Sequence, residues 1–309
     1  MHMRRFFQCT ILLAIVSSAG LSQSPVSTLV QEGSRRINGV RLYYTSMGSG
    51  DPVLFIHGGP GLDHTYFLPQ MSRLADSHRL VFFDQRASGR SGIPKDTAAM
   101  RISRFVDDIE GIRKALKLEH VTVLGHSWGT LLALRYALKY PKHITSLVLV
   151  SPVPASSAEQ TLAMQRVHIS KKDSVSLASL MKTRSFARRT PLAMERYFRL
   201  TFRGIMYKPS DASKIRLWFP RNYAARSRML RYLGSEAISF DLYPRLDSLR
   251  VHTLIIAGDH DPTPPSVLNH LQQSIPDARL VVVRNCGHFP SIEQPKQFFR
   301  ALRRFLKNQ

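Results

Sequence analysis

The chain has 309 residues, 43% of them hydrophobic, which is enough to bury one substantial core with something added to it. Its formal net charge is +23, from 44 Lys and Arg against 21 Asp and Glu, so we expect electrostatic association with anionic surfaces at low salt. Cys9 and Cys286 are the two cysteines, and removal of an N-terminal signal that contains Cys9 would exclude an intrachain disulfide.

The N-terminus has the pattern of an export signal. Arg4 and Arg5 precede an apolar run of 11 residues, and small and polar residues follow it. The run is well short of the roughly 20 residues that span a bilayer, which favours a removed signal peptide over a retained anchor. We therefore predict a signal peptide at residues 1–22 and export to a periplasm or the medium, with an N-terminal membrane anchor as the alternative.

Short apolar runs alternate with helical patterns through most of the chain. Modest alternation at residues 41–45, between turn residues on either side, predicts an early antiparallel hairpin. Continuous apolar runs predict strands buried on both faces at residues 53–56, 80–83, 121–124, 147–150, 254–256 and 280–283. Because helical spacing separates these runs, the fold class is α/β, with a mostly parallel sheet covered on both sides.

The alternation fails between residues 153 and 245. This segment has helical spacing but no run that resembles a buried strand. It carries 18 basic and 6 acidic residues, so about half of the excess positive charge lies in less than a third of the chain. We predict a core formed by residues 36–152 and 246–309, with an inserted helical cap at residues 153–245.

The pentapeptide GHSWG, residues 125–129, follows a predicted strand and precedes a helical pattern. A nucleophile elbow requires this context, because a strained turn there exposes a serine hydroxyl at the start of a helix. Flanking glycines allow close approach of the neighbouring backbone, and the helix dipole favours developing negative charge. Ser127 is therefore the predicted nucleophile, with an ordinary glycine-lined turn as the alternative.

A serine hydroxyl needs a base to take its proton and a carboxylate to orient that base. GDHD, residues 258–261, places Asp259 and Asp261 just past one predicted strand, and CGHFP, residues 286–290, places His288 just past the next. The order serine, acid, histidine is typical of α/β-hydrolases, and open α/β sheets bind ligands beyond the carboxyl ends of their strands. The residues predict His288 as the base and leave both acids open.

The motif HGGPG, residues 57–61, predicts a glycine-rich turn after a buried strand, which suits backbone donors for an oxyanion. We predict that the backbone N–H groups of Gly59 and Trp128 are these donors and that His57 braces the loop. The polar stretch DQRASGRSG, residues 84–92, is expected to form a supporting hydrogen-bonded network without a catalytic role.

Together these segments resemble the prolyl iminopeptidase family of serine peptidases, within the α/β-hydrolase superfamily. The resemblance rests on HGGPG, DQRASGRSG, GHSWG and GDHD, with DDIEGIR at residues 107–113 and CGHFPSIEQP at residues 286–295. It implies the α/β-hydrolase fold, with a mostly parallel eight-stranded sheet, helices on both faces and an inserted helical cap. It also implies Asp261 as the triad acid, no metal or organic cofactor, and release of N-terminal residues, often proline, from short peptides through an acyl-enzyme.

The chain departs from that family in its cap and at its elbow. Family members hold the free amine of the peptide with acidic groups in the cap, and Glu236 and Asp241 are the candidates here because they precede the return to the core. His126 stands where the family commonly has glycine.

These departures keep other functions open. One alternative is a carboxylic ester or amide hydrolase for a small apolar or anionic substrate. Another is a surface-binding protein that keeps the fold without turnover, against which the intact Ser, Asp and His set argues. The basic residues form no recognisable nucleic-acid-binding module, so no nucleic acid partner is expected.

Overall fold

The computed structural model describes residues 30–233 and 239–307, so the predicted signal peptide lies outside the described residues. The described strands form one eight-stranded sheet with the order β1-β2-β4-β3-β5-β6-β7-β8. The strands are β1 (Gln31–Ile37), β2 (Val40–Met47), β3 (Pro52–Ile56), β4 (Arg79–Phe83), β5 (Val121–His126), β6 (Ile144–Val150), β7 (Thr253–Gly258) and β8 (Ala278–Val283).

The predicted hairpin is formed by β1 and β2, which pair antiparallel across a two-residue turn. Both turn residues have positive φ, 46° at Asn38 and 81° at Gly39, as tight hairpin turns require. Strand β2 is also antiparallel to β4, and every pairing from β4 to β8 is parallel. The predicted fold class, a mostly parallel eight-stranded sheet, is confirmed.

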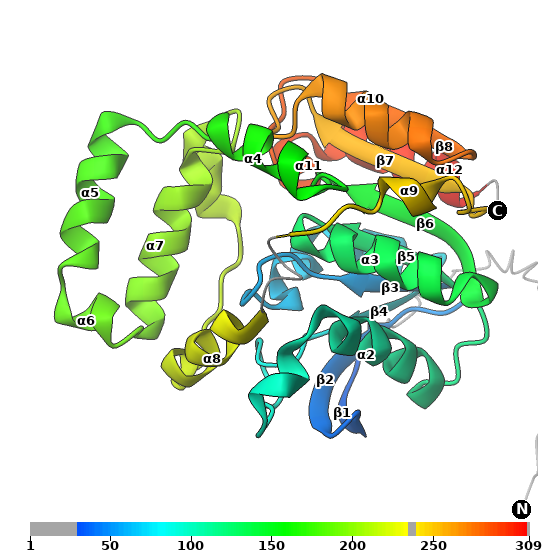
Figure 1. Cartoon of the computed structure of the whole chain (residues 1–309), viewed down its shortest axis with the longest axis horizontal. Coiled ribbons are helices and arrows are strands. Elements are labelled where there is room, and N and C mark those ends of the chain that lie inside the picture. Colours follow the sequence, from blue (N-terminus) through cyan, green and yellow to red (C-terminus); the bar gives the residue numbers. More distant parts are fainter. Residues whose placement is uncertain (1–29, 234–238, 308–309) are drawn as a thin grey trace, which may run out of the picture.

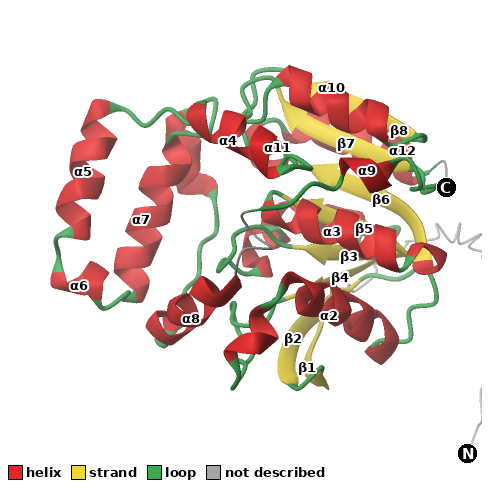
Figure 2. Cartoon of the chain, in the orientation of Figure 1, coloured by secondary structure: helices red, strands yellow, loops and turns green. Residues whose placement is uncertain are grey.

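Helices cover both faces of the sheet (Figures 1 and 2). The described α-helices are α1 (Leu68–Met71), α2 (Ile102–Ala115), α3 (Trp128–Lys139), α4 (Ser157–Gln165), α5 (Lys171–Met181), α6 (Arg184–Ala187), α7 (Pro191–Arg203), α8 (Tyr223–Leu230), α9 (Tyr243–Leu246), α10 (Pro265–Ser274), α11 (Pro290–Glu293) and α12 (Pro295–Leu306). Within the described ranges, no helix is long and apolar enough to cross a membrane.

Side chains that alternate along the central strands belong to two different hydrophobic clusters. Leu54 and Ile56 of β3 pack in one cluster with α2, α3 and α10, while Val53 and Phe55 pack in the other with α1 and α12. Burial of each large apolar side chain stabilises the fold by about 1.5–3 kcal/mol. The sheet is therefore a rigid support for the loops at the carboxyl ends of its strands.

The predicted helical cap is present between β6 and β7. Helices α5 to α7 stand away from the sheet (Figure 1, left), and the segment between β6 and β7 has no named strand among its described residues. The chain leaves and re-enters the core at one place, where Ser156 and Asp241 form an isolated antiparallel bridge. Two backbone hydrogen bonds flank it, from Ser157 to Phe240 and from Leu242 to Ala155, each 2.9 Å long.

One predicted strand differs from expectation in its burial. Residues 280–283 predicted a strand covered on both faces, but β8 is at the edge of the sheet and, among the described strands, pairs only with β7. Val282 is 48% exposed as a result. The continuous apolar run therefore predicted the strand correctly, but the prediction of a central position in the sheet was wrong, because edge and central strands can share that pattern.

Candidate active site

Ser127 lies at the sharp turn between β5 and α3. Its backbone angles, φ 54° and ψ −126°, are strained for a residue that carries a Cβ. Glycines permit the turn, because a Cβ at Gly125 would lie 2.6 Å from the carbonyl oxygen of Gly129, and one at Gly129 would lie 2.1 Å from that of Ile56. The turn holds the serine at the N-terminus of α3, where the helix dipole favours negative charge.

Ser127, His288 and Asp261 form a hydrogen-bonded series. Nε2 of His288 lies 2.9 Å from Oγ of Ser127, and Nδ1 of His288 lies 2.9 Å from Oδ2 of Asp261. Because a carboxylate only accepts, Nδ1 carries the hydrogen, and Nε2 of the neutral ring offers its lone pair to the serine hydroxyl. Three residues from loops after β5, β7 and β8 thus meet in the geometry that proton removal from a serine requires.

The structure distinguishes the two acids that the residue pattern left open. Burial alone would raise the pKa of Asp261, but electrostatic attraction to His288 and hydrogen bonds from His288 and Thr263 outweigh it, so the pKa of Asp261 lies below its ordinary value. The carboxylate of Asp259 instead accepts two backbone N–H groups at residues 285–286, each at 3.0 Å. Asp261 is therefore the acid in contact with His288, as the predicted triad requires, and Asp259 fastens the turn that precedes the histidine.

The HGGPG turn after β3 passes directly beside Ser127. A Cβ on Gly58 would lie 3.2 Å from the Cβ of Ser127, and Gly59 lines the same pocket as the serine. The backbone N–H of Gly58 donates to Oη of Tyr66 at 2.7 Å, so this group is already engaged. Gly59, the next residue, has φ 133°, a conformation that favours glycine. The oxyanion role of Gly59 and Trp128 stays a prediction, and the loop is close enough to the serine for it.

Gln85 ties the two predicted oxyanion segments together. Its Nε2 donates to the carbonyl oxygen of His57 at 2.6 Å, and its Oε1 accepts from Nε1 of Trp128 at 3.1 Å. Its backbone N–H donates to Nε2 of His57 at 3.1 Å, and burial lowers the pKa of His57 to about 4. The supporting network predicted at residues 84–92 and the bracing role of His57 are confirmed.

His126 connects the HGGPG turn to the loop of His288. Oη of Tyr66, which accepts from Gly58, lies 2.8 Å from Nδ1 of His126, and Nε2 of His126 lies 2.9 Å from the carbonyl oxygen of His288. That carbonyl only accepts, so Nε2 of His126 carries the hydrogen and Nδ1 accepts the tyrosine proton. Burial, reinforced by repulsion from His288, lowers the pKa of His126 to about 3, which keeps the ring neutral.

Glu293 anchors the loop that carries His288. Its carboxylate accepts the backbone N–H groups of Gly287 at 3.0 Å, Phe289 at 2.9 Å and Tyr207 at 2.8 Å. Tyr207 belongs to the cap, so one carboxylate fixes both the histidine loop and a segment of the cap. Sequence reasoning assigned no role to Glu293, although it lies within the quoted CGHFPSIEQP motif.

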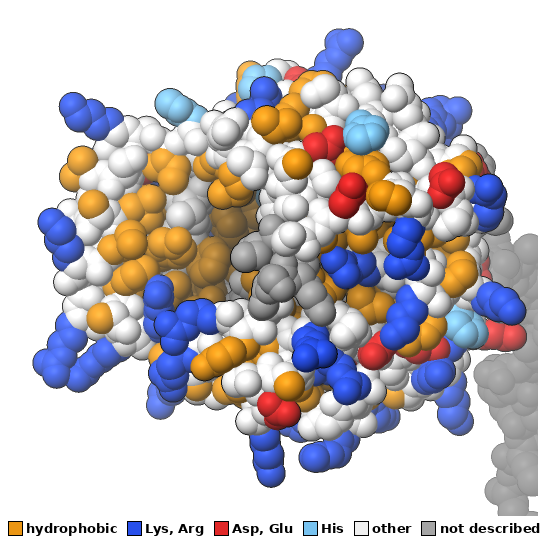
Figure 3. Space-filling model, in the orientation of Figure 1, with side chains coloured by type: hydrophobic (Ala, Val, Ile, Leu, Met, Phe, Trp, Pro, Cys, Tyr) orange, Lys and Arg blue, Asp and Glu red, His pale blue; other side chains and the backbone are white. Residues whose placement is uncertain are grey.

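A pocket of about 520 Å³ lies between the cap and the core over Ser127. In Figure 3, hydrophobic side chains gather over α5 and α7 and line the hollow between cap and core. The described lining residues are Gly59, Ser127, Pro152, Val153, Pro154, Gln160, Ala163, Met164, Val167, Ile169, Tyr197, Phe198, Thr201, Phe202, Ile205, Pro262, Thr263 and His288. Because this described set includes no Asp, Glu, Lys or Arg, the pocket suits an uncharged, apolar group.

None of the cap's acidic residues within the described ranges lines this pocket. Asp241 is exposed, and its carboxylate accepts the backbone N–H of Tyr243 at 3.0 Å. Glu236, the other residue proposed to bind an amine, lies outside the described residues. Glu159 hydrogen-bonds Tyr243 and His270. Across residues 30–233 and 239–307, no cluster of three or more His, Cys, Asp or Glu is placed to hold a metal ion.

Comparisons with known proteins agree with this architecture. The profile of a family described as "alpha/beta hydrolase fold" matches residues 51–174, which include the HGGPG and GHSWG turns. The chain has the α/β-hydrolase fold. A proline iminopeptidase from Heyndrickxia coagulans is 26% identical over 294 residues, which cover 90% of this chain and 99% of that protein. The resemblance to prolyl iminopeptidases that the motifs predicted is thereby confirmed as a likeness along most of the chain.

Solved structures of different named activities share this α/β-hydrolase fold. The crystal structure of proline iminopeptidase from Mycobacterium smegmatis superposes with a TM-score of 0.68 at 20% identity, covering 90% of this chain and 98% of that one. A thermophilic esterase from Thermogutta terrifontis gives a TM-score of 0.66 at 24% identity, with the same coverage of 90% and 98%. At these identities the superpositions establish the fold, while the activity depends on the site.

Proposed function

We propose that this α/β hydrolase is a serine hydrolase that cleaves carboxylic esters or amides with an apolar acyl group, through an acyl-enzyme on Ser127. The observation that carries the proposal is the series Ser127, His288 and Asp261, with both hydrogen bonds at 2.9 Å, opening on an apolar pocket. The three side chains provide the reactive group, and the apolar lining of the pocket indicates the substrate class.

In the proposed reaction, His288 takes the proton of Ser127 as Oγ attacks the substrate carbonyl carbon. Asp261 holds the ring in the required tautomer and stabilises the imidazolium that forms. The backbone N–H groups of Gly59 and Trp128 donate to the oxygen that becomes negative. His288 then protonates the leaving alcohol or amine as its bond to the acyl carbon breaks. A water molecule, deprotonated by the same histidine, releases the acid and restores the serine.

The substrate preference follows from what lines the pocket. An aminopeptidase must hold a free ammonium group, and burying that charge without a carboxylate partner is costly. No carboxylate is found among the described residues that line the pocket, and Asp241 does not line it. An uncharged ester or amide whose acyl part packs against Phe198, Phe202 and Met164 fits the described lining better.

The second candidate is the aminopeptidase activity that the sequence resemblance implied. Its support is the 26% identity to the proline iminopeptidase from Heyndrickxia coagulans, together with coverage of nearly all of that protein. This activity would need a carboxylate for the amine, and Glu236 is the remaining candidate among those named from the sequence. The Glu236→Gln variant should then lose proline p-nitroanilide turnover mainly through a higher KM.

The test combines covalent labelling with a substrate panel. A fluorophosphonate probe should label the wild-type protein and the Ser248→Ala variant, which changes an exposed serine, but not the Ser127→Ala variant. Persistent labelling of Ser127→Ala would refute the assignment. On p-nitrophenyl esters, kcat/KM should rise with acyl length from acetate as more apolar surface is buried, and proline p-nitroanilide should be a poor substrate. Exclusive turnover of the anilide would favour the aminopeptidase instead.

A further inference from the structure

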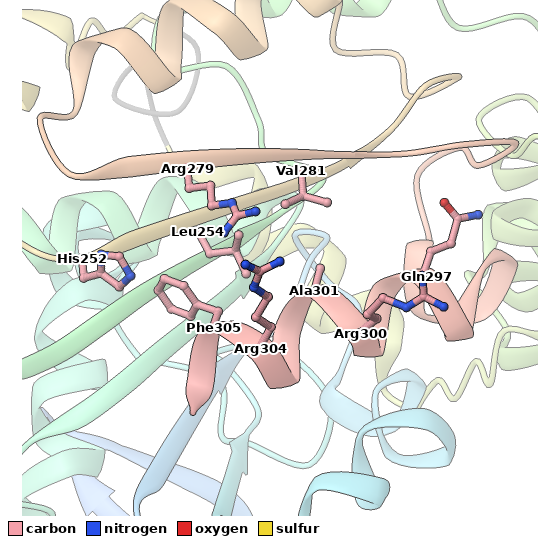
Figure 4. A pocket seen from close by; sticks show the side chains of 9 residues that line it. All are labelled: His252, Leu254, Arg279, Val281, Gln297, Arg300, Ala301, Arg304 and Phe305. Atoms are coloured by element: carbon pink, nitrogen blue, oxygen red, sulfur yellow. The ribbon is translucent and has the colours of Figure 1, made fainter. Parts of the chain in front are cut away.

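A second pocket lies between the edge of the sheet and α12. It has a volume of about 500 Å³, within the range of small-molecule sites, and Figure 4 shows the side chains that line it. It shares no described lining residue with the pockets at Ser127. Leu254 and Arg279, the second residues of β7 and β8, line it, whereas Asp261 and His288 follow the opposite ends of these strands. It is therefore separate from the proposed reaction.

Arginine side chains give this pocket its charge. Arg279 projects from β8, and Arg300 and Arg304 project from α12, four residues apart and so on one face of that helix. In Figure 4, the guanidinium groups of Arg279 and Arg304 extend toward the same space. None of these three guanidinium groups forms an ion pair or a hydrogen bond with another described residue, so their positive charges are left uncompensated within that part of the chain.

The rest of the lining is apolar. Leu254, Val281, Ala301 and Phe305 line the space beside the arginines. Phe305 is fixed by stacking on His252, with ring centroids 4.6 Å apart and planes 10° apart. Val281 of β8 is only partly buried, so apolar surface is available here. The pocket thus offers a cationic group of arginines next to an apolar surface.

We propose that this pocket binds a small organic phosphate monoester, with the phosphate between the arginines and the apolar body against Val281 and Phe305. A planar guanidinium pairs with phosphate oxygens through two parallel hydrogen bonds, and the guanidinium groups of Arg279 and Arg304, which extend toward the same space, together match a dianion with three free oxygens better than a carboxylate with two. The apolar side distinguishes an ester from inorganic phosphate. This site lies beyond the proposed hydrolase activity and requires none of its residues.

The test is calorimetric titration of the wild-type protein with phenyl phosphate, inorganic phosphate and benzyl alcohol, before and after fluorophosphonate treatment. Phenyl phosphate should bind about tenfold more tightly than inorganic phosphate, because its ring buries apolar surface, and benzyl alcohol should not bind measurably. Fluorophosphonate treatment should leave phenyl phosphate binding unchanged. Loss of binding after treatment would place the ligand at Ser127, and equal affinity for both phosphates would remove the apolar contribution; either result overturns the proposal.

Matched variants locate the site. Arg279→Gln and Arg304→Gln should each weaken phenyl phosphate binding by about tenfold, the effect of losing a hydrogen bond to a charged group. Arg104→Gln makes the same charge change at an exposed position on α2 and should bind like the wild type. Equal affinity in all three variants would overturn the location. Binding to phosphatidylglycerol vesicles that depends on Arg279 and Arg304, without binding of phenyl phosphate, would overturn the small-molecule ligand in favour of a lipid headgroup.

Discussion

Nε2 of His126 lies 2.9 Å from the backbone carbonyl oxygen of His288, so the residue before the proposed nucleophile holds the loop of the proposed base. On its other side, the same ring accepts from Tyr66, which in turn accepts from Gly58 of the HGGPG turn. One neutral imidazole therefore connects the loop that presents the proposed base to the loop that presents a proposed oxyanion donor. His126 stands where the resembled family commonly has glycine, and its side chain therefore adds hydrogen bonds that position these two loops.

Replacing His126 with glycine, the residue common in the resembled family, should lower kcat by about tenfold while KM changes little. The variant loses one buried and one partly buried hydrogen bond, each worth about 1 kcal/mol, and both loops gain freedom. Steady-state kinetics on a p-nitrophenyl ester would measure this. The control His120→Gly changes an exposed histidine before β5 and should match the wild type. Wild-type kcat in His126→Gly would contradict the positioning role.

Gln85→Leu should lower kcat by about ten- to a hundredfold, because it removes the hydrogen bonds to His57 and Trp128 that hold both oxyanion segments. Gln85→Glu keeps an acceptor for the Trp128 indole but loses the donor to the carbonyl of His57, so its loss should be intermediate. Steady-state kinetics of the wild type and the two variants, at equal concentrations of folded protein, would rank their kcat values. A larger effect of Glu than of Leu would show that charge, rather than loop position, governs the result.

The two neighbouring acids should respond differently to amide replacement. Asp261→Asn leaves Nδ1 of His288 without its carboxylate and should lower kcat by about ten-thousandfold. Asp259→Asn should have a mild effect on kcat, because this side chain accepts backbone N–H groups of the turn at residues 285–286 and pairs with Nδ1 of His260, but does not contact His288. Assays at high enzyme concentration, stopped at fixed times, would measure the rates of both variants. The reverse ranking would show that Asp259 orients the base.

Acid should destabilise the fold between pH 6.5 and 4. Burial lowers the pKa of His57 to about 4 and that of His126 to about 3, from an ordinary value of 6.5. The unfolded chain therefore binds more protons in this window, and stability, fully present above pH 6.5, is lost as the pH falls, by about 1.4 kcal/mol per pH unit for each histidine. Urea unfolding at several pH values would measure the slope, and His126→Gln should reduce it by one histidine's share.

Much of the fold was predictable because parallel strands buried on both faces leave continuous apolar runs, and six such runs are strands. The partial exposure of β8 was not predictable, because the order of the strands in a sheet cannot be read from the local sequence. Ser127, His288 and Asp261 could be picked from motifs at strand ends. Tyr66 could not, since nothing in its neighbourhood shows that its hydroxyl reaches Gly58 and His126. The export signal and association with anionic surfaces stay predictions.

The bridge between Ser156 and Asp241 has an evolutionary consequence. Since the cap leaves and rejoins the core at two adjacent points of the backbone, its roughly eighty intervening residues form an insertion that takes no part in the pairing of the eight strands. A donor segment with similarly spaced ends can take its place without any change in strand pairing. Selection can thus exchange the cap while the strands keep their pairing, and a grafted cap has to restore the backbone hydrogen bonds that Ile205 and Tyr207 make with His288 and Glu293.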